Sequence, residues 1–379
     1  MVSKCKVLVF IDWFYPAYKA GGPIKSVFNI ICALYNEVEF LVITSNIDLD
    51  GGLLNVRPNY EIKKSFYKII YLDKENQSRK VYKKLHENFN PHYVYYNNLF
   101  SWKFTLIPYS MFRNNIQVIA PRGMLGKGAL AIKPLKKNLF LKLAKLYLKN
   151  SKTIWHASTR QEEDEINQIL GDKVKVLIAQ NLSSKVEKRV LSGEFKKKEE
   201  LRLIFISRIS LKKNLLFLLE RLKDLKECLN IKLEIFGPIE DEIYWKKCMW
   251  IINSDNRISY SGVVHPDQID KMLNKSHFFV LPTKHENYGH AVVEAINQGV
   301  PVLLSKNTPW LNLAKTSIGF DIPLNDVEQW NQKIKELYEL ENEDYMNMVK
   351  SCYKYSLKNI VSSEVLEQNR NLFSIEYKS

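Results

Sequence analysis

Short apolar runs recur along the chain, and each has the length of one buried β-strand. In the first half of the sequence they lie at residues 5–11, 39–44, 67–71, 92–96, 116–120 and 153–156. In the second half they lie at residues 201–207, 232–237, 258–261, 277–282 and 301–305. Segments with helical spacing separate them, the clearest at 24–35, 214–229 and 289–298. Strands that alternate with helices are typical of parallel sheets, so the pattern predicts two Rossmann-like α/β domains.

The polar stretch at residues 183–200 is the best candidate for a linker between these domains, because it includes the charged run from Lys196 to Glu200. It predicts an N-terminal domain over 1–185 and a C-terminal domain over 190–354. A final helix at about 355–379 follows, and packing back on the first domain is one arrangement open to it. Two such domains would face each other across a cleft.

The composition fits two globular domains. The 379 residues are 46% hydrophobic and 26% charged, which excludes global disorder. The five cysteines are widely spaced, which argues against a disulfide framework or a thiolate metal site and favours a reducing cytoplasm. They are Cys5, Cys32, Cys228, Cys248 and Cys352. No targeting segment is visible and no stretch approaches the roughly 20 apolar residues of a membrane span, so any membrane contact is expected from one side.

The net charge of +15 is concentrated in one part of the chain. Residues 51–150 contain 19 Lys and Arg but only four Asp and Glu, which accounts for the whole excess. Such segregation favours an anionic partner, which could be nucleic acid, a membrane surface or an acidic ligand, although charge alone fits a solvated basic face equally well. Residues 133–150 also have the pattern of a basic amphipathic helix, which can lie on an anionic membrane or pack its leucines in the core.

The segment from His277 to Pro301 carries the most distinctive chemistry. A strand ends at Pro282, a loop carries Glu286, and a helix begins near Gly289. Ligands of open α/β sheets bind beyond the carboxyl ends of the strands, where helix amides can face an anion. The amides concerned here belong to Asn287, Tyr288, Gly289 and His290. Glu294 lies one turn inside the helix and would reach another part of the same ligand; alternatively, Glu286 caps the helix and Glu294 is solvated.

A second polar loop follows the strand at 201–207 and carries Arg208 and Lys213. The guanidinium fork and the mobile ammonium together suit a diphosphate. Taken by itself, such a pair is more commonly a solvated surface feature. The spacing of His285 and His290 does not match a zinc-binding helix, and we expect no metal site.

The pattern Arg208-x4-Lys213 followed by Glu286-x7-Glu294 resembles the signature of retaining glycosyltransferases of family GT4, which have the GT-B fold. Gly21-Gly22 after the first strand resembles that family's N-terminal loop. The segments Pro121–Leu125 and Trp155–Glu162 resemble a branch that builds bacterial capsule, O-antigen and exopolysaccharide.

The resemblance implies a role for each matching residue. Arg208 and Lys213 would hold the donor diphosphate and stabilise the leaving group. Glu286 would bind hydroxyls of the donor sugar, with amides from Tyr288 to His290 assisting, and Glu294 would hydrogen-bond the ribose. The glycines Gly21 and Gly22 would let the backbone approach the donor. The chain departs from the family at Asn214, where glycine is usual, and at Arg122-Gly123, where many members carry a histidine; His156 is available nearby, or is structural.

The function implied is transfer of a sugar, with retention, from a UDP- or GDP-sugar to a lipid-linked saccharide. No cofactor or metal is expected, and no nucleic acid partner. The basic residues within 101–152 would meet an anionic membrane surface, which places the protein peripherally on the inner face of the cytoplasmic membrane. Two alternatives remain open: a nucleotide-sugar epimerase of the same fold, and a non-catalytic protein that binds nucleic acid or another polyanion.

Overall fold

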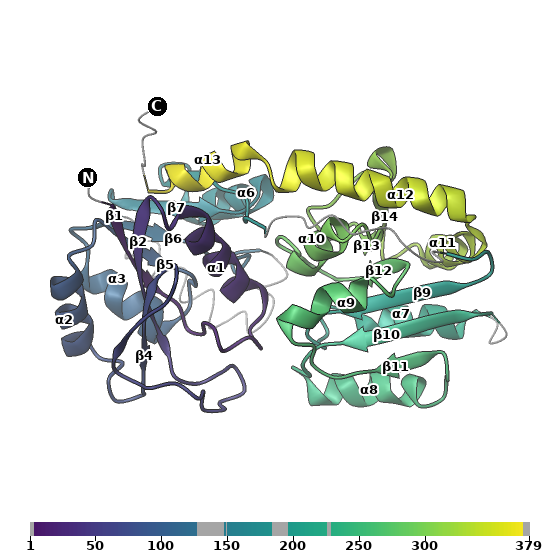
Figure 1. Ribbon diagram of the computed structural model, residues 1–379, viewed down its shortest axis with the longest axis horizontal. Helices are drawn as coiled ribbons and strands as arrows, with labels where there is room; N and C mark the ends of the chain where they lie inside the picture. The colour runs from purple at the N-terminus through teal and green to yellow at the C-terminus, as the bar shows by residue number, and fades with distance from the viewer. Residues whose placement is uncertain (1–3, 127–147, 149, 184–195, 226–228, 374–379) are drawn as a thin grey trace. The chain divides into compact units, whose positions relative to one another are not determined.

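A computed structural model describes residues 4–126, 148, 150–183, 196–225 and 229–373. The chain forms two compact units (Figure 1). The first comprises Met1–Ser184 and Ser363–Ser379, and the second comprises Lys185–Ser362. Each unit has a largely parallel β-sheet covered by helices, so the two-domain α/β architecture predicted from the apolar runs is confirmed.

The first unit contains an eight-stranded sheet in the order β3-β4-β2-β1-β5-β6-β7-β8. Its strands are β1 (Cys5–Phe10), β2 (Val38–Ser45), β3 (Glu61–Lys63), β4 (Lys68–Leu72), β5 (Tyr93–Tyr96), β6 (Ile116–Ile119), β7 (Thr153–Ala157) and β8 (Lys175–Ile178). All neighbours pair in parallel except β3 with β4. The central strand β1 places Val7 opposite Phe40 of β2 and Tyr93 of β5, which fixes the register on both sides.

Helices cover both faces of this sheet. Among the described residues they are α1 (Gly22–Leu34), α2 (Arg79–Phe89), the short π-helix η1 (Trp102–Leu106), α3 (Ile107–Met111), α6 (Arg160–Leu170) and α13 (Ser363–Asn371). Alternate residues of β1 enter two different cores. Val7 and Val9 pack with residues of α1, whereas Leu8 and Phe10 pack with residues of α2, α3 and α6. The sheet is therefore buried on both sides, as the continuous apolar run from Val7 to Phe10 requires.

Helix α13 belongs to the first unit, although it follows the whole second unit in the sequence. Arg370 pairs with Glu37 just after α1 at 2.8 Å, and the Phe373 ring lies 5.8 Å from the ring of Tyr93. The Asn369 side chain also donates to the Gln180 carbonyl at 2.9 Å. The helix begins at Ser363 rather than near residue 355, because the preceding segment still continues α12 in the second unit.

The second unit contains a six-stranded sheet in the order β11-β10-β9-β12-β13-β14, in which every pair is parallel. Its strands are β9 (Leu201–Ile206), β10 (Ile231–Phe236), β11 (Ile258–Tyr260), β12 (Phe278–Leu281), β13 (Val302–Ser305) and β14 (Gly319–Ile322). Its α-helices are α7 (Leu215–Lys223), α8 (Glu242–Ile252), α9 (Ile269–Leu273), α10 (His290–Asn297), α11 (Val327–Glu339) and α12 (Asn342–Tyr355). Short turns at Pro266–Gln268 (η2), Leu313–Thr316 (η3) and Ser356–Ile360 (η4) complete it.

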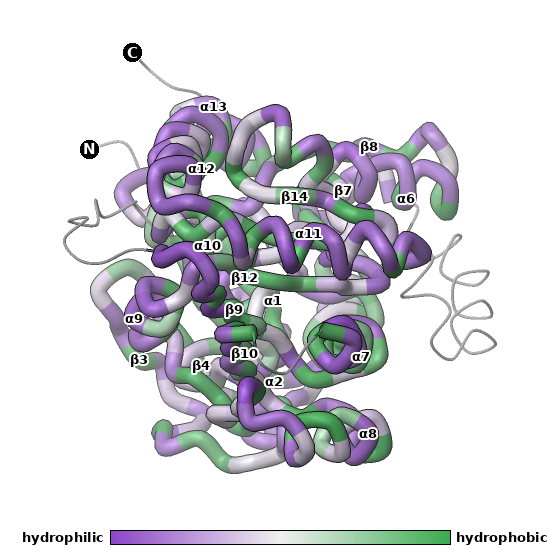
Figure 2. Tube along the Cα trace, turned by 90° about the vertical axis from the view of Figure 1, so that its right-hand side faces the viewer, coloured by the Kyte–Doolittle hydropathy of each residue, from purple (hydrophilic) through white to green (hydrophobic). Residues whose placement is uncertain are grey.

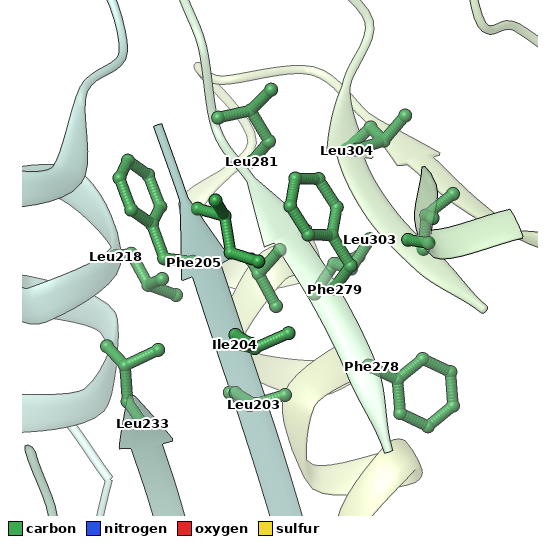
Figure 3. Packing of buried hydrophobic residues seen from close by; sticks show 14 of the residues in the cluster. Leu203, Ile204, Phe205, Leu218, Leu233, Phe278, Phe279, Leu281, Leu303 and Leu304 are labelled. Atoms are coloured by element: carbon green, nitrogen blue, oxygen red, sulfur yellow. The ribbon is translucent and has the colours of Figure 1, made fainter. Parts of the chain in front are cut away.

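The strand order reverses direction between β9 and β12. Crossovers of one hand then place α7 and α8 on one face, and α9 and α10 on the other. The strands and the outer helices differ in hydropathy: in Figure 2 the tube is green, or hydrophobic, along β12 and mostly purple, or hydrophilic, along α11. Figure 3 shows Phe278 and Phe279 leaving β12 in different directions, and both side chains are fully buried. The sheet thus supports a rigid edge from which the loops of this unit begin.

The end of the predicted linker is packed against the second unit. The Lys196 side chain is 2% exposed, and its ammonium donates to the carbonyls of Tyr338 at 3.0 Å and Leu340 at 2.8 Å, at the end of α11. Burial lowers the pKa of this lysine to about 8. The polar character of the run therefore reflects a helix cap in addition to a connection.

The apolar runs did not predict three of the observed strands, namely β3, β8 and β14, and all three are edge strands. Each carries a charged residue and has one neighbour, so none needs a continuous apolar run. The predicted amphipathic helix at 133–150 falls almost wholly outside the described residues. Within the part of the chain that the structure describes, no helix is both long enough and apolar enough to cross a bilayer.

Candidate functional site

The loops that follow β9 and β12 meet at the carboxyl edge of the second sheet. Because β9 leads to β10 on one side and pairs with β12 on the other, this edge is a topological switch point. Ligands of open α/β sheets bind at such points, since the connections diverge there to opposite faces. The predicted residues Arg208 and Lys213 lie in the first of these loops, and Glu286 lies in the second.

Lys213 and Glu286 form a nearly buried ion pair at this edge. The Lys213 ammonium lies 2.5 Å from Glu286 Oε2, and the two side chains are 12% and 14% exposed. Backbone hydrogen bonds hold both loops in place: the Lys284 amide donates to the Lys212 carbonyl at 2.8 Å, and the Glu286 amide donates to the Asn307 carbonyl at 3.0 Å. The pair is therefore positioned by three loops and is not the chance meeting of two flexible side chains.

Electrostatics keep the Glu286 carboxylate ionised. Burial alone would raise its pKa, but the charge and hydrogen bond of Lys213, the charge of Lys212 and the Asn287 amide lower it to about 2. The neighbouring Lys212 has a pKa lowered to about 8, mainly by burial and also by the like charges of Lys213 and Arg208. The site thus combines a fixed negative group with a local excess of positive charge.

Two backbone positions in the left-handed region shape this pair of loops. Asn214 precedes α7 with φ 59°, which explains how this chain replaces the glycine usual there, because asparagine tolerates this region better than most residues. Gly289 precedes α10 with φ 83°. A Cβ at Gly289 would lie 3.3 Å from Cγ of Glu286 and 3.1 Å from Cγ2 of Val292, so glycine lets the carboxylate loop close on the helix.

The other predicted residues of this unit lie around the pair, and of these the Asn287 amide contacts it directly. Arg208 pairs with Glu240, which follows β10, at 2.9 Å, and both side chains are at least one third exposed. The Asn287 amide donates to Glu286 Oε1 at 3.0 Å. Tyr288 is a core residue whose carbonyl accepts from Trp310 Nε1 at 2.5 Å. His290 opens α10, and the partly buried Glu294 lies in its second turn.

Sequence reasoning missed Lys212, Glu240 and Gly237 at this edge. Lys212 stands directly before Lys213 in the sequence, but nothing in the sequence distinguishes the role of one lysine from that of the other. Glu240 is found only through its contact with Arg208, which is a contact over 32 positions. Gly237 follows β10, and a Cβ there would lie 1.8 Å from the Ser207 carbonyl oxygen, so the signal was a glycine directly after a strand.

The remaining predicted residues belong to the first unit and form a separate polar network. The Arg122 guanidinium donates from Nε to Asn97 Oδ1 at 2.8 Å, from Nη1 to Asn181 Oδ1 at 2.6 Å and from Nη2 to the Tyr95 hydroxyl at 2.7 Å. The Gly123 amide donates to Glu162 Oε1 at 2.5 Å. Tyr95 lies at the end of β5 and the others follow β5, β6, β7 and β8, so the network lies at the carboxyl edge of the first sheet.

Gly21 and Gly22 open α1 at this same edge of the first unit. Gly21 caps the helix and Gly22 is its first residue. The Asn97 side chain, which accepts from Arg122, also donates to the Pro23 carbonyl at 2.9 Å. One asparagine therefore ties the glycine loop to Arg122.

His156 completes the network from within the core. It is fully buried, and its Nε2 lies 2.8 Å from the Ala179 carbonyl while its Nδ1 lies 2.9 Å from the Tyr95 hydroxyl. Nε2 must carry the proton to donate to a carbonyl, so Nδ1 accepts from Tyr95. Burial and the charge of Arg122 lower the pKa of His156 to about 3, which keeps the ring neutral. The histidine therefore fixes Tyr95, and through it Arg122.

Comparison with known proteins finds a similarity that lies within the second unit. Residues 187–355 match the family described as Glycosyl transferases group 1. An uncharacterized glycosyltransferase of Methanocaldococcus jannaschii is 24% identical over 107 residues, which are 28% of this chain and 27% of that protein. The alignment with this curated relative thus spans only about a quarter of its length.

Solved structures share the fold of the whole chain. HepE of Anabaena, in complex with UDP and glucose, is 13% identical with a TM-score of 0.71 over 97% of this chain and 98% of that chain. WaaG, a glycosyltransferase involved in lipopolysaccharide biosynthesis, is 13% identical with a TM-score of 0.71 over 98% of this chain and 100% of that chain. The predicted GT-B fold is confirmed, and together with the matched domain it supports a glycosyltransferase of the GT-B type.

Proposed function

We propose that this protein is a retaining, metal-independent glycosyltransferase that moves a sugar from a UDP- or GDP-sugar to a lipid-linked saccharide during surface polysaccharide synthesis. The observation that carries the proposal is the Lys213–Glu286 ion pair at the switch point of the unit that matches the group 1 glycosyl transferases. Structures of HepE of Anabaena with UDP and glucose, and with UDP-glucose, support a nucleotide-sugar donor.

The cations around the pair provide for the leaving group. Cleavage of a sugar–phosphate bond leaves negative charge on the diphosphate, and preorganised cations stabilise it. A lysine ammonium has three N–H groups, of which Glu286 occupies one here, so two remain for phosphate oxygens. Arg208 is held at the same edge by Glu240, and the diphosphate would take the place of that carboxylate.

The carboxylates at this edge bind and orient the donor. Because the pKa of Glu286 is about 2, its side chain is ionised at neutral pH and cannot protonate a leaving group. It can accept hydrogen bonds from sugar hydroxyls while it holds Lys213 in place. Glu294, one turn into α10, is proposed to accept from the ribose hydroxyls.

Retention follows when the acceptor approaches on the face that the diphosphate leaves. The bond between the anomeric carbon and the phosphate oxygen breaks, and its electron pair stays on the diphosphate. The acceptor oxygen forms the new bond, and its proton passes to an oxygen of the departing diphosphate. This sequence needs only the cations already named, which is why no metal is included.

A basic surface of the first unit supports a membrane-bound acceptor. On α2 the exposed cations are Arg79, Lys80, Lys83 and Lys84. The adjacent turn η1 exposes Lys103 and Trp102, and the Trp102 side chain is 66% exposed. Lysine and arginine attract anionic headgroups, and tryptophan favours the interface. Co-sedimentation with anionic vesicles should fall strongly in a Lys80→Glu/Lys83→Glu variant, and absence of binding by the unaltered protein at low salt would refute membrane docking.

The function itself is tested by ligand binding and then by turnover. A thermal-shift screen of UDP- and GDP-sugars should identify the donor, because stabilisation grows with the ratio of concentration to dissociation constant. Glu286→Gln and Lys213→Met should then abolish transfer, whereas Lys198→Met, which alters an exposed pair with Glu341, should leave it unchanged. Stabilisation by no nucleotide sugar, or full activity of Glu286→Gln, would contradict the proposal.

A further inference from the structure

Among the described residues, the guanidinium of Arg122 has no negatively charged partner. The hydrogen bonds that it donates go to neutral oxygens, on Asn97, Asn181 and Tyr95. Among the residues that the structure describes, no carboxylate lies within ion-pair distance of it. The nearby Glu162 is instead held by the Gly123 amide and by the amide and hydroxyl of Ser158, at 2.5, 2.8 and 2.7 Å. A cation fixed in this way is costly unless a ligand supplies the opposite charge.

The side chain is rigid and still has donors to offer. Asn97 and Asn181 are 3% and 2% exposed, and Tyr95 is itself held by the buried His156, so all three acceptors are fixed. Arginine has five N–H groups, and three are used, which leaves one on each terminal nitrogen. Two N–H groups are the number that a bidentate contact with a carboxylate or phosphate uses. Arg122 is partly exposed, so a ligand can reach it.

The backbone supports a functional role for this position. Arg122 has φ 55°, in the left-handed region, which costs a non-glycine residue about 1 to 2 kcal/mol. Strain of this kind is retained where the surrounding structure enforces it, and it concentrates at functional sites. Asn97 also joins Arg122 to the first turn of α1, a helix of 13 residues whose positive end adds to the field at this edge.

We propose that Arg122 is the centre of an oxyanion site in the first unit, which binds a carboxylate or phosphate of the substrate other than the donor diphosphate. The two sources are a uronic acid on a sugar and the phosphate of a lipid-linked acceptor. The role as a substrate site rests on the proposed function, but the binding itself belongs to the first unit alone. Arg122 would select anionic substrates, and the buried histidine and asparagines would position it.

The test measures probe binding to the full-length protein with UDP present in excess, so that the second unit is occupied. Methyl phosphate represents the acceptor phosphate and glucuronate represents the uronic acid. One of them should bind, and Arg122→Gln should weaken it on the order of 10- to 100-fold, the value of one or two charged hydrogen bonds. Arg122→Lys keeps the charge without the fork and should bind in between. Lys64→Gln, which removes an exposed cation of the same unit to which no binding role is assigned, should have no effect.

Three results would overturn the proposal: binding of neither probe, equal losses in Arg122→Gln and Lys64→Gln, or a loss of UDP affinity in Arg122→Gln as large as in Lys213→Met. The last would assign Arg122 to the donor diphosphate. If UDP does not bind at all, the proposed function fails. Binding of methyl phosphate or glucuronate to Arg122 can still be measured in the Lys213→Met variant, which lacks the Lys213 ammonium of the second unit. Thermal unfolding of Arg122→Lys serves as the folding control, since it retains a donor to the buried oxygens.

Discussion

Replacement of Lys213 by methionine separates the structural role of the ion pair from its chemical role. The substitution keeps an unbranched side chain and removes the ammonium that faces Glu286. The carboxylate is then left 14% exposed with the Asn287 amide and the charge of Lys212 as its main support. The companion variant, Lys213→Met/Glu286→Gln, removes both charges.

The size of the effect follows from the carboxylate. A pKa lowered from 4.5 to about 2 corresponds to about 3 kcal/mol in favour of the ionised form in the folded protein. Removal of one partner of a buried pair costs a similar amount, about 3 to 5 kcal/mol. Lys213→Met should therefore lower the stability of the second unit by about 3 kcal/mol, or its Tm by roughly 6 to 12 °C. The double variant should recover most of this loss without recovering activity.

Thermal unfolding at pH 7.5 and low salt measures the four members of this double-mutant cycle, and hydrogen exchange of residues 206–214 and 282–290 assigns the change to the site. The same pair predicts a pH dependence. Because the folded pKa of Glu286 is depressed, its contribution is present above about pH 4.5 and is lost as the pH falls toward 2. The double variant should lack that part of the acid sensitivity.

The reasoning would be refuted by a Lys213→Met variant no less stable than Lys198→Met. The latter breaks an exposed pair, 56% and 59% exposed, whose charges are screened by solvent and which should contribute little to stability. A coupling energy between Lys213 and Glu286 below about 0.5 kcal/mol in the double-mutant cycle would also refute it.

Other predictions address the loops around this pair. Gly289→Ala should cost about 1 to 2 kcal/mol at φ 83° and reduce transfer, because the new Cβ meets Cγ of Glu286; thermal unfolding and a donor-turnover assay measure both effects. Asn214→Gly should leave the stability within about 0.5 kcal/mol, whereas Asn214→Ala should lower it by about 1 kcal/mol, as denaturant titration can show. Glu240→Gln should release Arg208 and strengthen UDP binding a few-fold by calorimetry; weaker binding would show that Glu240 assists the donor. Transfer should persist in EDTA, and its loss with recovery on added Mg²⁺ would refute metal independence.

The sequence was sufficient for the central parts of the fold and much less so for its edges. β12 is buried on both faces and appears as an unbroken apolar run, and β9 gives the same signal over Leu203–Ile206, after Arg202. β8 and β14 lie at sheet edges and contain Lys175 and Asp321, so they lack that signal. The segment at 133–150 stays a prediction.

The site was predictable as residue types but not as contacts. Strand, loop and helix order placed Lys213 and Glu286 beyond the ends of strands, yet their positions are 73 residues apart, and only the parallel pairing of β9 with β12 brings them together. The same holds for Arg122, whose partners lie 25 to 59 positions away. No local pattern marks Asn97 or Asn181 as acceptors, because an asparagine after a strand usually forms a turn.

The return of α13 to the first unit has a consequence for biosynthesis. Phe373 covers aromatic side chains of the first sheet, but the ribosome makes this helix only after the whole second unit. At about 5 to 20 residues per second, synthesis of Lys185–Ser362 takes roughly 10 to 40 s. During that interval the apolar surface around Phe40 and Tyr93 lacks the cover that Phe373 later provides, so the nascent first unit is exposed to premature association there.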